Sequence, residues 1–416
     1  MLPEQVSVLV AGGGAAGFMT AIVAAEAGAT DVHVLEATAE PLSKVRISGG
    51  GRCNVTHACW DPRALVGHYP RGERALRGPF SRFATGDAVA WFDAHGLALV
   101  EEPDGRLFPR SNRSESVVNT LRQAALGAGV QVHTGIALQR ISRDAAGFCA
   151  TLRGSRQVRC SRLVLATGGH PSGRLLAASL GHQLVPPVPS LFSLALAPQS
   201  LQALAGVAMD PVDLQLRIGA PQGAPLLHRQ RGAVLITHRG LSGPALLRLT
   251  AFAARDLQAA GYRAQLVVNW SGDRSAGAIE TLLDQLRREQ ARRQLGSWRP
   301  WSELSRRLWL HLLEATAVDP QQRWAALRRK QQLDLAAALT ASHYNVCGRG
   351  PFGEEFVTAG GVDLGEINLA TMESRLCAGL QVVGELLDVD GITGGFNFQH
   401  CWTSGWLAGQ ALAGLN

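Results

Sequence analysis

The sequence predicts an α/β fold built from more than one domain. Three observations predict it: a β-α-β pattern around a Gly-rich turn near residue 12, strand-like runs in the middle of the chain, and a helical stretch after which glycines return. At 416 residues the chain is long enough for two or three domains, and its 46% hydrophobic content is sufficient for buried cores.

The β-α-β pattern consists of a strand at 6–10, an apolar helix at 15–27 and a second strand at 32–35. Residues 5–25 carry no charge and are long enough to resemble a membrane span, but their glycines fit a strand, a turn and a helix better. The segment before them contains an acid and no basic run, which does not resemble a secretory signal. We therefore expect a cytoplasmic protein without a membrane segment.

The later elements follow in order. We expect helices at 87–95 and 114–126, β-prone stretches over 130–152, and an apolar strand in "RLVLATGG" at 162–169. Prolines then interrupt an uncharged region, which predicts a domain boundary near 185. Beyond it lie strand-like runs at 233–238 and 264–270, a helical and basic stretch over 275–342, and a last helix at 397–412.

The turn after the first strand reads Gly12-x-Gly14-x-x-Gly17, a dinucleotide-binding fingerprint. Its glycines allow a tight turn and a close approach of the backbone to a pyrophosphate at the N-terminus of the helix. Glu36 ends the second strand, 19 residues after Gly17, where a carboxylate can accept hydrogen bonds from ribose hydroxyls. The context of the fingerprint therefore predicts a nucleotide cofactor, either NAD or FAD.

A second Gly-rich segment, "GELLDVDGITGGFNF", precedes the last helix and favours FAD. The positive end of that helix would stabilise negative charge on a reduced flavin, and Asn397 with the N–H groups of Gly394 and Gly395 would supply donors. Glu385 and Asp390 could bind ribityl or ribose hydroxyls. The alternative is that these glycines form tight turns and that the acids cap a helix.

The stretch 287–330 holds eleven cations and four acids, together with four of the nine tryptophans: Trp298, Trp301, Trp309 and Trp324. Basic residues interleaved with aromatics suit a surface that binds phosphates and stacks bases, so RNA is a candidate partner. Arg-rich helices with Trp on the inner face are also ordinary packing, and the presence of only two lysines indicates codon bias. Both interpretations remain open at this point.

Cysteine and histidine patterns predict no metal site. The seven cysteines are scattered without a C-x-x-C pair, which is typical of reduced thiols, and the histidines show no metal-ligand spacing. We expect neither a disulfide framework nor a bound metal.

Taken together, the motifs resemble the bacterial FAD-dependent flavoproteins of the BaiN/RdsA type, which include ribosomal-RNA dihydrouridine synthase, the bile-acid-inducible reductase and aminoacetone oxidase. The resemblance covers nearly the whole chain. Its marks are "GGGAAG" at 12–17, "KVRISGGGRCN" at 44–54, "DGRLFP" at 104–109, "LATGG" at 165–169, "ITHRGLSGPALL" at 236–247, "VTAGGV" at 357–362 and "GELLDVDGITGGFNFQ" at 384–399.

The resemblance implies a Rossmann-like FAD-binding domain of the glutathione-reductase type, formed by 1–185 and 345–416 and interrupted by a β-rich domain (186–272) and a small helical basic domain (273–344). It implies FAD as the cofactor, with the Gly-rich loop after Lys44 wrapping the nucleotide. The predicted cofactor contacts are Gly12, Gly14, Ala15, Ala16, Gly17, Glu36, Lys44, Ser48, Gly49, Gly50, Gly51, Arg52, Cys53, Asn54, Ile136, Gly168, Gly169, Gly384, Glu385, Asp390, Thr393, Gly394, Gly395, Phe396 and Asn397.

Glycines in this loop let backbone N–H groups reach phosphate or ring oxygens, while Lys44 and Arg52 could offset the pyrophosphate charge. Cys53 is the candidate catalytic residue, as a proton donor beside the flavin. The alternative is a small thiol that fills a tight loop.

One departure is visible. Many relatives carry a longer insertion after the "ATGG" motif, whereas here "GGHPSGRLLAASLGH" continues directly into a helix, with His170 either facing the flavin or capping that helix.

The resemblance implies an oxidoreductase in which NAD(P)H, docking transiently, reduces FAD, which then reduces an electron-poor C=C bond. The first expectation for the substrate is a uracil in ribosomal RNA. The alternatives are a small-molecule enone reductase or amine oxidase and, from another class, an RNA-binding protein with a structural FAD. The sequence predicts nothing about the oligomeric state.

Overall fold

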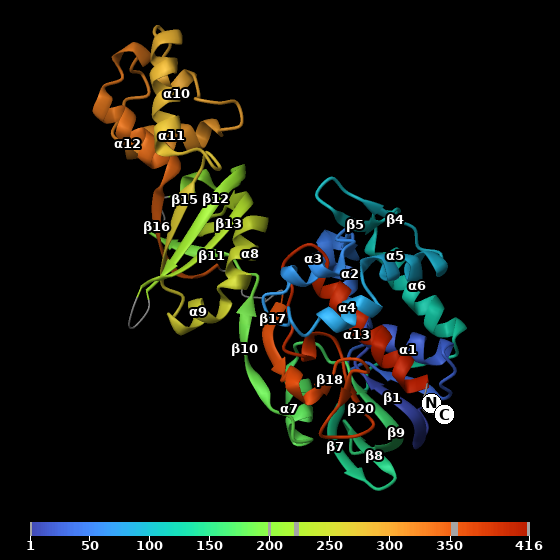
Figure 1. Cartoon of the computed structure of the whole chain (residues 1–416). Helices are drawn as coiled ribbons and strands as arrows, with labels where there is room; N and C mark the ends of the chain where they lie inside the picture. The colour runs from blue at the N-terminus through green and yellow to red at the C-terminus, as the bar shows by residue number, and fades with distance from the viewer. Residues whose placement is uncertain (1, 199–200, 220–223, 351–356, 414–416) are drawn as a thin grey trace. The chain divides into compact units, whose positions relative to one another are not determined.

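The computed structural model of the chain describes residues 2–198, 201–219, 224–350 and 357–413 (Figure 1). The chain divides into two compact units: Met1–Pro187 with Val357–Asn416, and Val188–Phe356. The predicted α/β fold class, a Rossmann-type domain interrupted by a β-rich region and a helical region, is confirmed.

The main sheet of the first unit has the order β18-β19-β20-β9-β1-β2-β6, with the β7-β8 hairpin joined to β9. Strands β20, β9, β1, β2 and β6 run parallel, so their carboxyl ends meet at one edge. The bounds are β1 Gln5–Ala11, β2 Val32–Leu35, β6 Gln131–His133, β7 Leu138–Asp144, β8 Gly147–Leu152, β9 Gln157–Leu165, β18 Ile367–Asn368, β19 Glu373–Ser374 and β20 Leu380–Val382.

Helices α1 (Ala15–Glu26) and α13 (Phe396–Ala413) pack closely against each other. Small residues permit the approach, because a Cβ on Gly405 would lie 2.8 Å from the Ala16 carbonyl oxygen. The other helices of this unit are α2 Ser43–Gly51, α3 Pro62–Leu65, α4 Arg77–Arg82, α5 Thr85–Ala94, α6 Ser114–Gly127 and α7 Pro171–Ser179, with 3-10 turns η1 Val66–His68, η5 Leu364–Glu366 and η6 Gly384–Leu386.

Two smaller sheets complete the strands of this part of the chain. One has the order β3-β5-β4, and the other pairs β10 with β17. The bounds are β3 Thr56–His57, β4 Leu99–Glu101, β5 Arg106–Pro109, β10 Leu184–Ser190 and β17 Val357–Val362.

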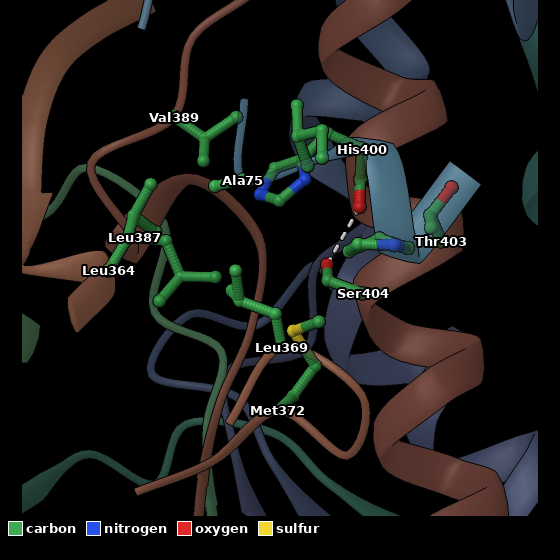
Figure 2. A pocket seen from close by; sticks show the side chains of 11 residues that line it. Ala75, Leu364, Leu369, Met372, Leu387, Val389, His400, Thr403 and Ser404 are labelled. Atoms are coloured by element: carbon green, nitrogen blue, oxygen red, sulfur yellow. Dashed lines mark hydrogen bonds between the residues drawn. The ribbon is translucent and has the colours of Figure 1, made fainter. Parts of the chain in front are cut away.

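An apolar pocket lies beside α13 and is too narrow to hold water (Figure 2). Its polar lining residues are His400, Thr403 and Ser404, and His400 Nε2 lies 3.3 Å from the Gly384 carbonyl oxygen. Burial lowers the pKa of His400 to about 4, so the ring is neutral at physiological pH. The pocket is therefore part of the packing between α13 and the η6 turn rather than a substrate site.

The second unit contains a closed barrel with the order β11-β14-β13-β12-β15-β16, in which every pair is antiparallel. Its bounds are β11 Leu194–Ala197, β12 Ala208–Ile218, β13 Leu226–Ile236, β14 Gly240–Ser242, β15 Ala264–Asn269 and β16 Ser342–Arg349. Because β16 returns to the barrel after the helices, the compact unit runs past residue 345, where the sequence suggested that the cofactor domain resumes.

The helices of the second unit share one hydrophobic core with the barrel. Trp309 and Trp324 are completely buried in it, with ring centroids 6.3 Å apart. The helices are α8 Pro244–Phe252, α9 Ala254–Ala259, α10 Ala276–Glu289, α11 Arg306–Ala315 and α12 Arg329–Thr340, with 3-10 turns η2 Gln202–Leu204, η3 Leu295–Ser297 and η4 Trp324–Ala326.

Candidate functional site

The Gly-rich turn lies at the carboxyl end of β1, and its three fingerprint glycines have different roles. A Cβ on Gly12 would lie 2.3 Å from the Ala166 carbonyl oxygen, and one on Gly17 would lie 2.0 Å from the Gly12 carbonyl oxygen. Gly14, by contrast, has nothing within 4 Å of its Cβ position, and no side chain caps α1 there. Packing inside the protein requires the outer glycines, whereas Gly14 leaves open space beside the N–H groups of Ala15 and Ala16, as a pyrophosphate requires.

Glu36 is held against this turn. Its Oε2 accepts a hydrogen bond from Gly13 N at 3.0 Å, and its Oε1 accepts from Thr38 N and Oγ1, each at 2.8 Å. Ile136 N donates to the Glu36 carbonyl oxygen at 2.9 Å, which places the predicted adenosine-side residues together. A carboxylate fixed in this way keeps lone pairs for ribose hydroxyls.

The second Gly-rich loop is attached to the first, because Leu42 N donates to the Gly13 carbonyl oxygen at 2.8 Å. The helix α2 kinks at Ser48, and Gly49, Gly50 and Gly51 have φ values of 57°, 69° and 84°. Positions 50 and 51 have nothing within 4 Å of a Cβ. The loop therefore offers open backbone in a conformation that favours glycine.

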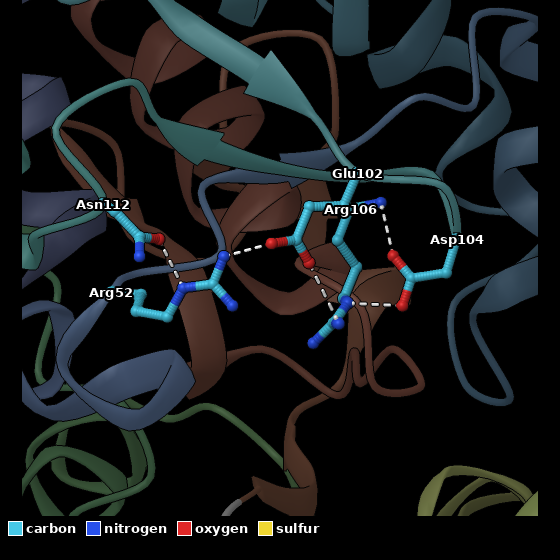
Figure 3. A network of polar contacts seen from close by, with 5 residues as sticks. All are labelled: Arg52, Glu102, Asp104, Arg106 and Asn112. Atoms are coloured by element: carbon cyan, nitrogen blue, oxygen red, sulfur yellow. Dashed lines mark hydrogen bonds and ion pairs between the residues drawn. The ribbon is translucent and has the colours of Figure 1, made fainter.

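The structure gives Arg52 protein partners (Figure 3). Its Nε donates to Asn112 Oδ1 at 2.5 Å, its Nη2 pairs with Glu102, and its guanidinium lies 3.9 Å from the centroid of the Phe108 ring. Glu102 also binds Arg106 at 3.1 Å. Arg52 is thus bound within the β3-β5-β4 region, and its predicted role in offsetting pyrophosphate charge stays a prediction.

Cys53 is completely buried, and burial raises its pKa to about 12. The thiol is thus neither a thiolate nor an effective acid at neutral pH, which favours the loop-filling interpretation over catalysis. The neighbouring Asn54 differs, because its buried Oδ1 has no partner among the residues that the structure describes. A bound ligand would satisfy this atom.

Glu385 brings distant segments together. Its Oε2 accepts from Lys44 Nζ at 2.8 Å, and its Oε1 accepts from Thr358 N at 3.1 Å. A Cβ on Gly169 would lie 3.0 Å from Glu385 Oε1, so the "ATGG" segment is in contact with this carboxylate. Gly168 has a φ of 61°, and Gly384 has a φ of 67°. The sequence motifs did not single out Thr358 for this contact.

Two predicted cofactor contacts have their side chains bound to the protein instead. Asp390 is completely buried and paired with Arg71. Asn397 accepts from Gly391 N at 2.8 Å and donates to the Gly391 carbonyl oxygen at 2.9 Å. Both side chains therefore hold the 390–397 segment, and a direct role toward a flavin remains a prediction. No local signal marks Arg71, because its partner is 319 positions away.

The turn before α13 is held by contacts with Thr56 and Tyr69. Gly394 and Gly395 have φ values of 119° and 93°, and a Cβ on Gly395 would lie 2.8 Å from the Thr56 backbone. Tyr69 Oη donates to the Phe396 carbonyl oxygen at 2.6 Å. Thr393 precedes these glycines. The turn is therefore held by contacts with the protein itself, which suits a helix N-terminus that faces developing negative charge.

His170 directly precedes α7 as its N-cap residue, and its Nδ1 accepts a hydrogen bond from Ser172 N at 3.2 Å. It therefore caps that helix.

The basic stretch of the second unit contains both paired and stacked cations. Arg287 pairs with Asp284 at 3.0 Å, Arg288 pairs with the same carboxylate, and Arg329 pairs with Glu280 at 2.6 Å. Two partly buried tryptophans carry cations instead: Arg293 lies 4.3 Å from the Trp298 ring, and Arg274 lies 4.9 Å from the Trp301 ring. The other two tryptophans, described above, belong to the core.

Within the described part of the chain, no helix is long and apolar enough to cross a membrane, and no group of three metal-ligating side chains gathers.

The family model of the HI0933-like protein Rossmann domain matches residues 6–411. The 3-dehydro-bile acid delta(4,6)-reductase of Clostridium scindens is 31% identical over 97% of this chain and 98% of its own length. The ribosomal RNA dihydrouridine synthase of Escherichia coli is 30% identical over 98% of both chains. A solved structure, the 3-ketosteroid delta1-dehydrogenase of Sterolibacterium denitrificans, is similar with a TM-score of 0.53, 12% identity and full coverage of both chains, which shows the shared fold.

Proposed function

From the premise that this chain belongs to the HI0933-like family and is an FAD-dependent oxidoreductase, we propose that it uses NAD(P)H to reduce a C=C bond of a uracil in ribosomal RNA. The observation that supports FAD as the cofactor is the combination of three features: open backbone at Gly14, the Glu36 carboxylate held against the Gly-rich turn, and the contacts around Glu385. The reaction is proposed from the relatives, two of which are named as reductase and RNA-modifying enzyme.

The residues present fit FAD. The N–H groups of Ala15 and Ala16 would bind the pyrophosphate, Glu36 would bind the adenosine ribose, and the loop at Gly50 and Gly51 would pass along the nucleotide. When bound, FAD supplies two-electron transfer between the nicotinamide donor and the substrate. The chain supplies a rigid turn at Gly394 and Gly395 with oriented N–H groups.

The RNA substrate is supported by the stacked pairs of the second unit. Arg293 over Trp298 and Arg274 over Trp301 combine positive charge with an aromatic surface, which suits phosphates and unstacked bases. A small-molecule enone reductase is the second candidate, favoured by the 31% identity to the bile-acid reductase. An amine oxidase and an RNA-binding protein with a structural FAD are further outcomes of the test.

The experiment compares oxidation of NADH and NADPH by the purified FAD-loaded protein in the presence of unmodified ribosomal RNA, a conjugated enone or a primary amine. We expect turnover with RNA and formation of dihydrouridine. Turnover with the enone alone would support the second candidate, oxygen consumption with the amine would support the oxidase, and RNA binding without turnover would support the structural role.

A charge variant tests the surface. Replacing Arg274, Arg292 and Arg293 with Gln should weaken RNA binding and reduce the slope of log affinity against log salt by up to about 2 to 3, because each phosphate contact contributes roughly 1. The matched control replaces Arg287 and Arg288, which pair with Asp284. FAD content should stay unchanged in both variants. Equal RNA affinity in the unmodified protein and the triple variant would remove this stretch from the proposed interface.

A further inference from the structure

His57 ends strand β3 and packs against the first residue of α13. Its ring centroid lies 4.8 Å from that of Phe396, with an interplanar angle of 19°, and His68 lies 4.3 Å from the same Phe396 ring. The three rings form a cluster, and a Cβ on Gly394 would lie 3.1 Å from Phe396 Cε2. His57 is absent from the set of residues that the sequence motifs indicated.

Two glycines make room for the His57 imidazole. A Cβ on Gly105 would lie 2.5 Å from His57 Cε1, and a Cβ on Gly394 would lie 3.2 Å from His57 Cδ2. One glycine belongs to the "DGRLFP" segment and the other to the turn before α13. The ring is therefore held between two backbone segments, and its position relative to the turn is fixed.

The Nδ1 atom of His57 is buried and has no hydrogen-bond partner among the described residues. A buried polar atom without a partner is costly, so in a native protein it calls for an explanation such as a bound ligand, an ordered water or a catalytic role. Asn54 Oδ1, three residues earlier, is in the same condition. Both atoms lie within residues 54–57, which lead from the Gly-rich loop into β3.

We propose that His57 takes up a proton at Nδ1 when FAD bound at this turn is reduced, so that the imidazolium offsets the negative charge that reduction creates. This inference rests on the proposed function, because it requires bound FAD. The two electrons come from the reductant, NAD(P)H or dithionite, and the proton on His57 comes from solvent.

The surroundings set the resting state of the ring. Burial lowers the pKa of His57 below its ordinary value, the backbone and carboxylate of Asp104 and the carboxylate of Glu101 raise it less, and Arg106 lowers it by the smallest amount. His68 faces the ring from η1. The imidazole is thus neutral near pH 7 before reduction. A negative charge on FAD bound at the turn would raise the pKa of the His57 imidazole, and the ring would then bind a proton.

The experiment measures the flavin midpoint potential against pH for the FAD-loaded protein and for His57→Phe, which retains an aromatic ring against Phe396 but has no basic nitrogen. The unmodified protein should show one additional proton taken up per two electrons, or about 30 mV per pH unit, within a window above the pKa of the oxidised state. His57→Phe should lose that increment. The control His95→Gln, which removes a histidine bound to Glu26 at 2.8 Å, should keep it.

An unchanged slope in His57→Phe with FAD retained would overturn the inference. If that variant loses FAD, nitrogen-15 NMR of labelled histidine in the unmodified holoprotein decides the matter, with the His57 signal assigned from the spectrum of a His57→Gln variant. Equal His57 pKa values before and after dithionite reduction would also overturn it. If the purified protein carries no FAD, both the proposed function and this inference fail. If FAD is bound but the slope is unchanged in His57→Phe, only this inference fails.

Discussion

Gly14 in the first unit and Trp301 in the second both lie in stretches that suggest a ligand, but their surroundings differ. Gly14 has open space where a Cβ would stand, flanked by glycines that the fold itself requires. Trp301 is partly buried under Arg274, and its neighbours in sequence, Trp309 and Trp324, are core residues. A spacing motif constrains backbone geometry, whereas a composition pattern can be produced by packing alone.

The largest effect is expected from substitutions in the Gly-rich turn, which test whether Gly14 is required for ligand binding rather than for folding. Gly14→Val should leave the fold intact and abolish FAD binding, because the added side chain enters the space that a pyrophosphate would occupy. Gly17→Val should instead prevent folding, because its Cβ would lie 2.0 Å from the Gly12 carbonyl oxygen. Flavin absorbance and circular dichroism of both purified variants separate the two effects. A yellow, folded Gly14→Val protein would contradict the assignment.

The second prediction sharpens the comparison within the basic stretch. Trp309→Ala should destabilise the second unit by about 3–5 kcal/mol, because it empties a completely buried site and removes the bond from Nε1 to the Leu295 carbonyl oxygen. Trp301→Ala should cost much less stability but weaken RNA binding about tenfold or more. Urea unfolding and RNA titration provide the two measurements. Equal destabilisation by both variants would mean that Trp301 belongs to the core as well.

The third prediction concerns His400, which lies in the first unit with its Nε2 against the Gly384 carbonyl oxygen. Because its pKa is lowered from 6.5 to about 4, the unfolded state binds its proton first as the pH falls. Its contribution to stability is therefore fully present above pH 6.5 and is lost between pH 6.5 and 4, by about 3 kcal/mol. His400→Gln should flatten this part of the profile of unfolding free energy against pH. An unchanged profile would contradict the neutral buried state.

The smallest effect is expected at Cys53. With a pKa near 12, its thiol is not a proton donor at neutral pH, so Cys53→Ala should change kcat less than about threefold once FAD is bound. The measurement is steady-state turnover at saturating donor, normalised to flavin content. A loss of a hundredfold or more would restore the catalytic interpretation of this residue.

The fold class and the first turn could be predicted because their signals are local. Gly12, Gly14, Gly17 and Glu36 belong to one β-α-β unit, so their spacing in sequence maps directly onto their spacing in the structure. The partners of Arg52, Asp390 and Lys44 could not be predicted, since each is fixed by a residue 50 to 341 positions away. Such contacts depend on tertiary packing, which residue types and periodicity do not encode.

His57 is a residue that the sequence analysis missed for the same reason, because its contacts come from distant segments. Its neighbours in sequence gave no reason to single it out, and its position became informative only when Gly105 and Gly394 were seen to clear space around it. Both glycines lay inside recognised motifs. A side chain at either glycine, however, would crowd the His57 imidazole, which comes from a third segment.

The placement of β20 beside β9, and of α13 against α1, also has a consequence for biosynthesis. The second unit is contiguous in the chain and can fold as soon as it leaves the ribosome, whereas the parallel sheet of the first unit lacks β20 and its covering helix until later residues have been translated. At roughly 5–20 residues per second, the nascent sheet waits roughly 10–40 s with an open edge at β9. Nascent chains stalled before β20 should therefore be sensitive to protease in the first unit and resistant in the second.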